Sequence, residues 1–245
     1  MKADIAILGG GIVGCNIAWH LASRQGGAKI VVIERDPSYQ NAATPLGNGG
    51  IRRLFSLPEN IAMAQYGLDF YAAFAERLAI DGAPTPIGFK RQGYLFLSDD
   101  GGADQMEQNY RFQVSQGVNA ELLDAAALGE RFPSLSPDGI TIAVHSPDDA
   151  WIDPYAALQG LRDHGRSLGV QFVTGEIKAW EGDAVAARRV ILDGGETIEA
   201  DTFVNACGAW AAEVGGLIGL ELPVEPMSRE SYFFRCARRL EPLPF

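Results

Sequence analysis

The chain has 245 residues, of which 47% are apolar and 21% are charged, as in a globular protein with a sizeable core; at roughly 100–200 residues per domain, one large or two small domains are expected. The formal net charge of −11 argues against nucleic acid and anionic lipid as partners, because binding to either needs a basic surface. No stretch approaches the roughly 18 apolar residues that a membrane-spanning helix requires.

The N-terminal residues do not have the pattern of a secretory signal peptide. Lys2 is followed closely by Asp4, and the apolar run after it breaks at glycine after only a few residues. We therefore expect a cytoplasmic location.

The most informative motif lies in the first 34 residues. The apolar run Asp4–Leu8 leads into a glycine-rich turn, Gly9–Gly14, and then into an amphipathic stretch that ends at Gly26. A second apolar run, 29–33, stops at Glu34, which lies 20 residues past Gly14. Strand, G-x-G-x-x-G turn, helix, strand and distal acid in this order predict a dinucleotide-binding fold.

Each part of this motif has a physical task. Gly9 permits the tight turn, Gly11 lacks the Cβ that would keep a pyrophosphate away, and Gly14 lets the helix pack closely on the strand. The first backbone N–H groups of the helix, at Ile12 and Val13, point at the phosphates. The remaining member of the motif, the acid Glu34, accepts hydrogen bonds from ribose hydroxyls and disfavours a 2′-phosphate, so that NADP is not expected. A glycine turn that only closes a strand–helix corner is the alternative to this interpretation.

The next elements follow from composition and periodicity. Residues 36–50 are rich in Pro, Asn, Gly and Ala and predict a loop, directly before Arg52 and Arg53. A long helix is expected from about Pro58 to Ile80, with one apolar face made by Ile61, Ala64, Leu68, Tyr71 and Phe74. Residues 81–88 are a turn-rich break.

The middle of the chain predicts a small α+β unit inserted into the first domain. Its expected elements are β structure over 89–97 around Gly93, a polar helix over about 101–116, a short helix capped by Asp124 that ends before Pro133, and a strand over 140–146.

The chain then returns to alternating strands and helices. Asp153-Pro154 opens a helix to about Leu168, since Asp is a good N-cap and Pro suits the first helical position. The elements expected after it are a strand over 170–174, a hairpin closed by 193–195, and a buried strand over 202–206 that runs into Cys207-Gly208-Ala209-Trp210.

No metal site and no disulfide framework are predicted. The three cysteines, Cys15, Cys207 and Cys236, are far apart and form no C-x-x-C pair. The three histidines, His20, His145 and His164, form no metal-spaced cluster. Cys15 is expected to be a small buried residue of the first helix.

Together these motifs resemble the FAD-dependent amino-acid and amine oxidoreductases of the D-amino-acid oxidase superfamily, which includes the glycine and sarcosine oxidases. The resemblance rests on ordered motifs at 4–14, 31–34, 47–52, 151–155, 205–210 and 222–226. Residues 53–61 and 222–226 resemble one branch of this family in particular.

The resemblance implies an α/β fold in which a Rossmann-like FAD-binding domain carries an inserted, incomplete α+β substrate domain. We expect the FAD-binding domain over 1–80 and 147–220, and the partial substrate domain over 81–146 and 221–245. Family members continue well past this point, so part of the substrate pocket is expected to be missing, and a strand is expected to begin at 232–235.

The resemblance also implies site residues and favours FAD over NAD. Glycines 9, 11 and 14 hold the pyrophosphate, and Glu34 with Arg35 holds the adenosine ribose. The backbone of Ile177 meets the adenine. The residues expected along the pyrophosphate–ribityl path and beside the flavin ring are Ala206, Gly208, Trp210, Asn48, Gly49 and Gly50.

A catalytic base is not identified. Arg52 or Arg53 is a candidate for stabilising charge near the flavin or for holding a substrate carboxylate, which a guanidinium fork suits. A surface or phosphate-facing role is the alternative for both arginines.

The implied reaction is oxidation of the C–N bond of an amino acid or related primary or secondary amine, by hydride transfer to the flavin, to an imine that hydrolyses. Two alternatives remain: a non-catalytic FAD-binding assembly or interaction factor, including an inactive fragment of such an enzyme, and an NAD-dependent dehydrogenase. The expected partners are a small-molecule amine or amino-acid substrate and either an electron-acceptor protein or a complementing subunit.

Overall fold

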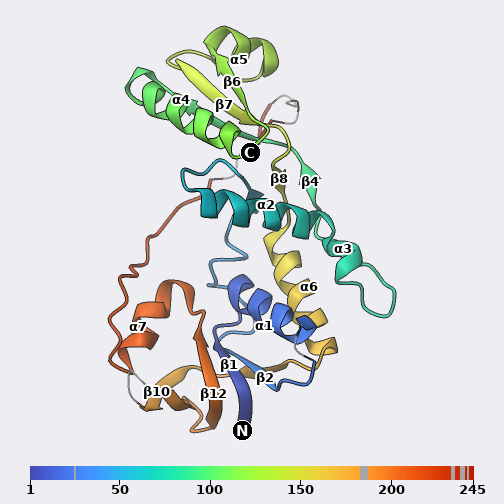
Figure 1. The fold of residues 1–245 in the computed structure, drawn as a ribbon, viewed down its shortest axis with the longest axis vertical. Coiled ribbons are helices and arrows are strands. Elements are labelled where there is room, and N and C mark those ends of the chain that lie inside the picture. The colour runs from blue at the N-terminus through green and yellow to red at the C-terminus, as the bar shows by residue number, and fades with distance from the viewer. Residues whose placement is uncertain (25, 183–186, 233–234, 238–240, 242) are drawn as a thin grey trace. The chain divides into compact units, whose positions relative to one another are not determined.

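A computed structural model describes residues 1–24, 26–182, 187–232, 235–237, 241 and 243–245 (Figure 1). The chain forms two compact units, which are described separately. Unit 1 comprises Met1–Asn48, Leu78–Thr85 and Pro154–Ser231. Unit 2 comprises Gly49–Arg77, Pro86–Asp153 and Tyr232–Phe245.

Unit 1 is built on a six-stranded sheet with the strand order β10-β11-β12-β1-β2-β9. The four strands β12, β1, β2 and β9 are parallel, whereas β10 and β11 form an antiparallel ribbon that continues into β12 (Figure 1). The bounds are β1 (Lys2–Leu8), β2 (Ile30–Glu34), β9 (Gln171–Thr174), β10 (Ile177–Gly182), β11 (Ala187–Leu192) and β12 (Thr197–Asn205). The parallel part is the α/β arrangement that the sequence predicts.

Helix α1 (Ile12–Arg24) connects β1 to β2 and packs beside α6 (Pro154–Ser167). The small residue Ala18 of α1 is buried with Ile7, Ile30 and Val32 of the sheet, which explains why a helix with small residues on one face lies close to the strands. After β12 the chain forms a 3₁₀ turn, η1 (Gly208–Trp210), and the short helix α7 (Ala211–Gly216).

The register of the parallel strands brings their carboxyl ends together. Leu8 lies opposite Asn205 on one side and Ile33 on the other, and Glu34 lies opposite Thr174. The segments that follow these strands therefore meet at one edge of the sheet, where ligands bind in open α/β folds.

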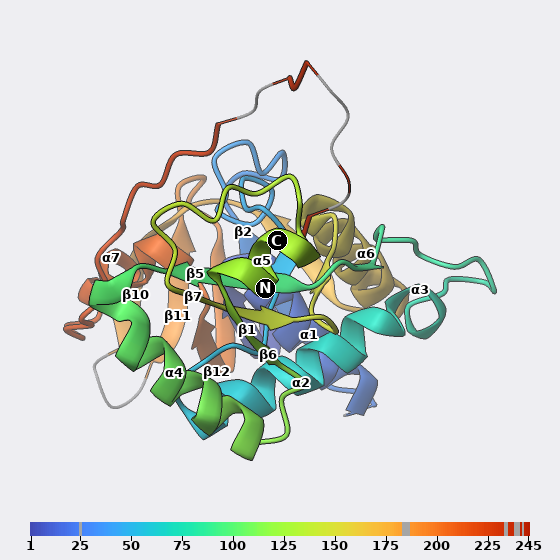
Figure 2. The ribbon, with the colours of Figure 1, turned by 90° about the horizontal axis from the view of Figure 1, so that it is seen from above.

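Unit 2 contains two antiparallel three-stranded sheets, one with the order β3-β8-β4 and one with the order β5-β7-β6. The strands of the second sheet are labelled in Figure 2. The strands are β3 (Gly50–Ile51), β4 (Lys90–Arg91), β5 (Tyr94–Ser98), β6 (Glu121–Asp124), β7 (Ile142–Ser146) and β8 (Ala150–Trp151). The helices are α2 (Pro58–Ala72), α3 (Phe74–Arg77), α4 (Asp100–Ser115) and α5 (Ala125–Arg131).

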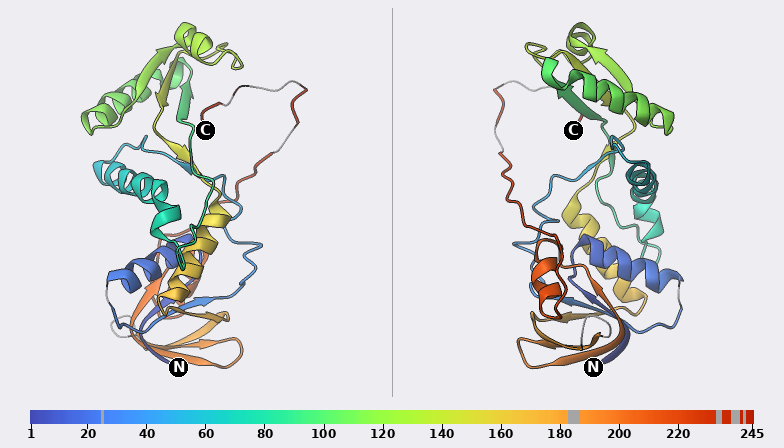
Figure 3. Two further views of the ribbon diagram at one scale, coloured as in Figure 1. Left: turned by 90° about the vertical axis from the view of Figure 1, so that its right-hand side faces the viewer. Right: turned by 60° about the vertical axis from the view of Figure 1, so that its left-hand side comes forward.

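The sheet β5-β7-β6 has a helix on each face (Figure 3). Val144 faces a cluster that includes Met106 of α4, whereas its neighbour Ala143 faces Leu128 of α5. Because successive side chains of a strand point to opposite faces of the sheet, adjacent apolar residues of β7 pack against α4 on one face and α5 on the other.

Several predicted elements are confirmed in this unit. The β structure around Gly93, the polar helix and the strand over 140–146 are present as β4–β5, α4 and β7. The carboxylate of Asp124 accepts a hydrogen bond from the backbone N–H of Ala127 at 2.8 Å, as an N-cap does. Among the helices that the structure describes, none is long and apolar enough to cross a membrane.

The single helix expected over 58–80 is wrong. Helix α2 ends at Ala72, and Ala73 has φ −98° and ψ 10° before the single turn of α3. The buried rings of Phe70 and Phe74 pack edge to face across this break, with centroids 5.8 Å apart. Phe70 and Phe74 are four residues apart, a spacing that a continuous helix also brings together, so their packing does not explain the break.

The domain boundaries expected from the sequence stay a prediction, and the two compact units follow different limits. Residues 49–77 lie in unit 2 rather than with the first domain, because Leu54 and Ile61 pack in one cluster with Val144. Residues 221–231 lie in unit 1. Of the strand expected to begin at 232–235, residues 233–234 lie outside the described residues, and Tyr232 and Arg235 are in no strand.

Candidate functional site

The glycine-rich turn of unit 1 has the geometry that its sequence predicts. Gly9 has φ +98°, and a Cβ on it would lie 2.5 Å from the carbonyl oxygen of Ala206. A Cβ on Gly14 would collide with the carbonyl oxygen of Gly9. At Gly11, in contrast, the nearest atom to an added Cβ is the hydroxyl of Thr44 at 3.8 Å. The turn is thus tightly packed at Gly9 and Gly14 and open at Gly11.

The carboxylate of Glu34 reaches over this turn. Its Oε2 accepts a hydrogen bond from the N–H of Gly10 at 2.8 Å, and its Oε1 accepts one from the N–H of Asp36 at 2.9 Å. Each carboxylate oxygen has a second lone pair, so both retain the capacity to accept a hydroxyl. The distal acid therefore lies beside the glycine turn with lone pairs left to accept ribose hydroxyls; that contact stays a prediction.

Two further side chains enclose Gly10. The thiol of Cys15 donates to the Gly10 carbonyl at 3.1 Å, and burial raises the pKa of Cys15 to about 12, which keeps the thiol protonated. The hydroxyl of Tyr39 lies 3.3 Å from the place of an added Cβ on Gly10. Tyr39 is buried and has φ +58°, a left-handed conformation that is rare for a bulky residue. The sequence analysis missed Tyr39, because a single aromatic residue in a loop has no periodicity.

The start of α1 has one side-chain partner that the sequence analysis also missed. The N–H of Ile12 donates to the hydroxyl of Thr44 at 3.2 Å. Val13 follows in the first turn with an exposed side chain. The sequence offers one signal for this contact, a Thr in the loop that follows Glu34. Ser and Thr hydroxyls commonly bind backbone N–H groups at the start of a helix.

Arg35 and Trp210 meet at this same edge of the sheet. The guanidinium carbon of Arg35 lies 3.9 Å from the centre of the Trp210 ring, a cation–π contact. Arg35 follows β2 and Trp210 follows β12, and these strands flank β1. Between β12 and Trp210, Gly208 leaves room: it has φ +54° and nothing lies within 4 Å of an added Cβ, whereas Ala206 packs closely against Gly9.

Ile177 lies at the beginning of β10, three residues after the end of β9. The intervening Gly175 donates its N–H to the backbone oxygen of Glu34 at 3.0 Å, which holds the β9–β10 connection against the end of β2. The structure therefore gathers the expected nucleotide residues of unit 1 around one edge of its sheet; their contacts with a ligand stay predictions.

The loop residues expected beside the flavin divide between the two units. Asn48 belongs to unit 1, where its Oδ1 accepts a hydrogen bond from the Ser231 hydroxyl at 3.3 Å. Gly49 and Gly50 belong to unit 2. A Cβ on Gly50 would lie 2.8 Å from the Phe245 ring, so this glycine allows close packing within unit 2. Its place beside a flavin stays a prediction.

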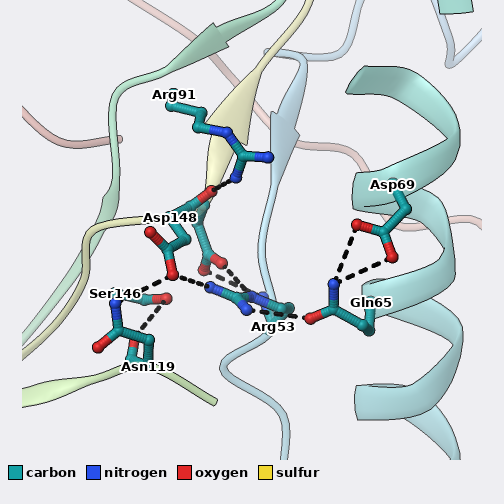
Figure 4. Close-up of polar contacts among 8 residues, drawn as sticks. Arg53, Gln65, Asp69, Arg91, Asn119, Ser146 and Asp148 are labelled. Carbon is teal, nitrogen blue, oxygen red and sulfur yellow. Dashed lines mark hydrogen bonds and ion pairs between the residues drawn. The ribbon is translucent and has the colours of Figure 1, made fainter. Parts of the chain in front are cut away.

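Arg53 lies inside unit 2, in a set of polar contacts drawn in Figure 4, and its residue is 5% exposed. Its Nε donates to Oδ1 of Asp149 at 2.8 Å, and its Nη1 donates to Oε1 of Gln65 at 3.0 Å. Its Nη2 lies 3.5 Å from Oδ2 of Asp148. The structure thus gives Arg53 one buried partner, Asp149, and two partly exposed partners, Gln65 and Asp148; a contact of Arg53 with a ligand stays a prediction.

Arg52 has different surroundings. Its guanidinium carbon lies 4.9, 5.1 and 5.7 Å from the ring centres of Phe55, Phe96 and Tyr94. The side chain is partly exposed, and no carboxylate of the described residues forms an ion pair with it. Of the two candidate arginines, Arg52 is the one whose hydrogen-bond donors remain available to an anion.

A metal role has no support in the part of the chain that the structure describes, where no group of three His, Cys, Asp or Glu side chains is placed to hold an ion.

Comparison with known families decides which family the chain belongs to. The model of the DAO family, described as FAD dependent oxidoreductase, matches residues 4–244. The chain belongs to this family.

The DAO-family relatives include the branch that residues 53–61 and 222–226 resemble. FAD-dependent oxidoreductase domain-containing protein 1 of Bos taurus is 32% identical over 96% of this chain and 55% of its own length. The chain therefore spans about half the length of the relatives that it matches.

Solved DAO-type structures share the fold. The L-proline dehydrogenase from P. horikoshii matches with a TM-score of 0.77 and 27% identity, over 89% of this chain and 56% of that one. The glycine oxidase from Geobacillus kaustophilus matches with a TM-score of 0.77 and 25% identity, over 92% and 60% of the two chains.

FAD is the cofactor of this family, which answers the choice between FAD and NAD. Unit 1 fits the adenosine-diphosphate part of FAD in two respects: Gly11 and Gly208 leave open space at the edge of the sheet, and the Glu34 carboxylate retains acceptor capacity. The residues that would hold the pyrophosphate are the glycine turn and the N–H groups that begin α1, with Thr44 beside them.

Proposed function

We propose that this chain carries the FAD-binding part, and a portion of the substrate-binding part, of an oxidoreductase acting on the C–N bond of an amino acid or related primary or secondary amine. The observation that carries the proposal is the Glu34 carboxylate bound to the Gly10 N–H beside the open Gly11, in a chain of the DAO family. The names of the proline dehydrogenase and the glycine oxidase with which it shares a fold support an amino acid as substrate.

The chemistry divides between the cofactor and the protein. When bound, FAD supplies the two-electron acceptor that amine oxidation needs. The glycine turn and the start of α1 bind the pyrophosphate, and Glu34 orients the adenosine ribose. Arg52 binds the carboxylate of an amino-acid substrate and so orients the C–H bond that is broken. The substrate would give a hydride to the bound cofactor and a proton to water and become an imine, which a second water molecule then hydrolyses.

The direct test uses the purified full chain reconstituted with FAD. Under anaerobic conditions, glycine, sarcosine and L-proline are added in turn and the flavin absorbance is recorded. We expect at least one of them to bleach the flavin, and its hydroxy-acid counterpart not to do so. Arg52→Gln should raise the half-saturating concentration about tenfold or more, because a hydrogen bond to a charged group contributes roughly 1.5–3 kcal/mol. A colourless protein after reconstitution would contradict the proposal for this chain.

A second candidate is a FAD-binding assembly or interaction factor without turnover. It is motivated by the branch of the family that the chain resembles, FAD-dependent oxidoreductase domain-containing protein 1, whose name states no substrate. A stable flavin spectrum that none of the amines bleaches would support it, and bleaching would exclude it. The electron-acceptor protein, the complementing subunit and the cytoplasmic location stay predictions.

A further inference from the structure

We propose that Asp149 is a positioning residue, which holds the segment Gly49–Arg53 through Arg53 and thereby sets the direction of the Arg52 guanidinium. The inference rests on the proposed function in one respect, the role of Arg52 as the ligand of a substrate carboxylate. The contacts that carry it lie within unit 2.

Asp149 accepts hydrogen bonds from both the side chain and the backbone of Arg53. Its Oδ1 accepts from Nε of Arg53 at 2.8 Å, and its Oδ2 accepts from the backbone N–H of Arg53 at 3.0 Å. Asp149 is 0% exposed, so that these charge-assisted bonds are shielded from water. Two bonds from one carboxylate to one residue fix the chain direction at Arg53 as well as its side chain.

Asp149 is itself held in place by its backbone. Its carbonyl oxygen accepts from the N–H of Gly93 at 2.9 Å, and its N–H donates to the carbonyl of Ser146 at 3.4 Å. It stands between β7 and β8, and β8 pairs with β3 through Ala150 and Ile51. Asp149 therefore directly precedes the strand β8 that pairs with β3, and β3 is part of the segment Gly49–Arg53 that Asp149 holds.

The other two guanidinium nitrogens of Arg53 face two neighbouring elements: Nη1 is hydrogen-bonded, whereas Nη2 is in an ion pair without a hydrogen bond (Figure 4). Gln65 of α2 accepts from Nη1 and donates its own Nε2 to Asp69 at 3.2 Å. Asp148 lies 3.5 Å from Nη2 and accepts from Nδ2 of Asn119 at 3.0 Å. Arg53 is thereby fixed between α2 and the β7–β8 turn.

Arg52 has no comparable anchor of its own. Its contacts are with the faces of aromatic rings, which tolerate sliding, and no described carboxylate holds it in an ion pair. The direction in which its guanidinium points is therefore set by the backbone of the segment, and Asp149 fixes that backbone one residue away. Removing the Asp149 charge also leaves the buried Arg53 guanidinium without its main counter-ion.

The test compares Asp149→Asn with the wild-type full chain. Asp148→Asn is the matched control, because it is the adjacent carboxylate, is 44% exposed at its side chain and contacts Arg53 more weakly. Two properties are measured: amide hydrogen exchange of residues 50–55 in the protein without FAD, and the dissociation constant of benzoate from the FAD-loaded protein, read from the flavin spectrum.

We expect Asp149→Asn to speed exchange at residues 50–55 at least tenfold relative to that of β5 and β7, and to raise the benzoate dissociation constant at least fivefold. Asp148→Asn should change each by less than twofold. Arg53→Lys is the second variant, because it keeps the buried charge but cannot donate from two nitrogens at once. It should weaken benzoate binding in the same direction even if Asp149→Asn fails to fold.

Two results would overturn the positioning role. One is unchanged exchange at 50–55 in Asp149→Asn, or in Arg53→Lys if the first variant does not fold. The other is an increase spread evenly over unit 2, which is general destabilisation. Failure of the proposed function appears differently, as a protein that takes up no FAD or as benzoate binding that Arg52→Gln leaves unchanged; the exchange measurement then decides the positioning role alone.

Discussion

The carboxylate of Glu34 and the backbone N–H of Gly10 are joined by a hydrogen bond of 2.8 Å, which links the end of β2 to the middle of the glycine turn. The second oxygen of Glu34 is bound to the N–H of Asp36. Both oxygens therefore face backbone donors. A Cβ on Gly10 would lie 3.0 Å from the Cβ of Glu34, so a larger residue at position 10 would crowd the Glu34 side chain.

Glu34→Gln should weaken binding of ADP and FAD by about tenfold or more. The amide places an NH₂ group against one of two N–H donors, and a hydrogen bond to a charged acceptor contributes roughly 1.5–3 kcal/mol. Isothermal titration with ADP measures the adenosine anchor without the flavin. Glu199→Gln is the control. Glu199 lies on β12, is exposed and forms an ion pair with Arg189 of β11. Equal ADP affinity in Glu34→Gln and the wild type would contradict the assignment.

Gly14→Ala should destabilise the protein by about 1–3 kcal/mol, because its Cβ would collide with the carbonyl oxygen of Gly9 and force the turn to shift. The matched substitution is Gly67→Ala, also inside a helix but with nothing within 4 Å of the added Cβ. It should stabilise the protein by about 0.5–1 kcal/mol through helix propensity. Urea denaturation followed by circular dichroism measures both, and a Gly14→Ala midpoint equal to that of the wild type would show that the turn is not tightly packed.

The three cysteines should differ in their reactivity with iodoacetamide. Burial raises the pKa of Cys15 to about 12 and that of Cys207 to about 11, whereas Cys236 is exposed. Because the thiolate is the reacting form, Cys236 should be alkylated at least about tenfold faster than the other two at pH 8. Peptide mass spectrometry gives the three rates, and in urea they should become similar. Early labelling of Cys15 in the folded protein would contradict its burial under the Gly10 carbonyl.

His164 should make the stability of the protein fall at mildly acidic pH. Trp19 donates its indole N–H to Nδ1 of His164 at 2.9 Å, which requires that nitrogen to be unprotonated, and burial lowers the pKa of His164. The unfolded chain therefore binds a proton at a higher pH than the folded one, and this stability is present above about pH 6.5 and lost as the pH falls toward the lowered pKa.

The test of this pH dependence is His164→Gln, since a glutamine oxygen can accept from Trp19 but does not titrate. The decline of the urea midpoint between pH 7 and pH 5 should be shallower in this variant than in the wild type. Identical declines would place the pH dependence elsewhere in the protein.

The nucleotide anchor is the part of the site that local sequence predicts well. The turn Gly9–Gly14 and the acid Glu34 are separated by one helix, and the packing of a βαβ unit leaves little freedom in how its strand ends meet. Thr44 and Tyr39 escaped prediction, because a loop without regular hydrogen bonds has no period from which its side-chain directions follow.

The adjacent arginines show the opposite case. Nothing in the sequence around Arg52 and Arg53 distinguishes them, because the partner that does so, Asp149, lies 96 residues away along the chain. The end of α2 is a second feature that periodicity misses: the apolar positions continue past Ala72, whereas Ala73 leaves the helical conformation with φ −98° and ψ 10°.

The sequence by itself therefore determined the dinucleotide-binding architecture, the family resemblance and the order of most strands and helices, since these depend on neighbouring residues and on short-range periodicity. Only the tertiary structure decided that Arg53 is buried in an ion pair, that Arg52 keeps its donors available and that residues 49–77 pack in unit 2. The physical reason is that burial and charge pairing are properties of contacts between distant segments, and such contacts exist only once the chain has folded.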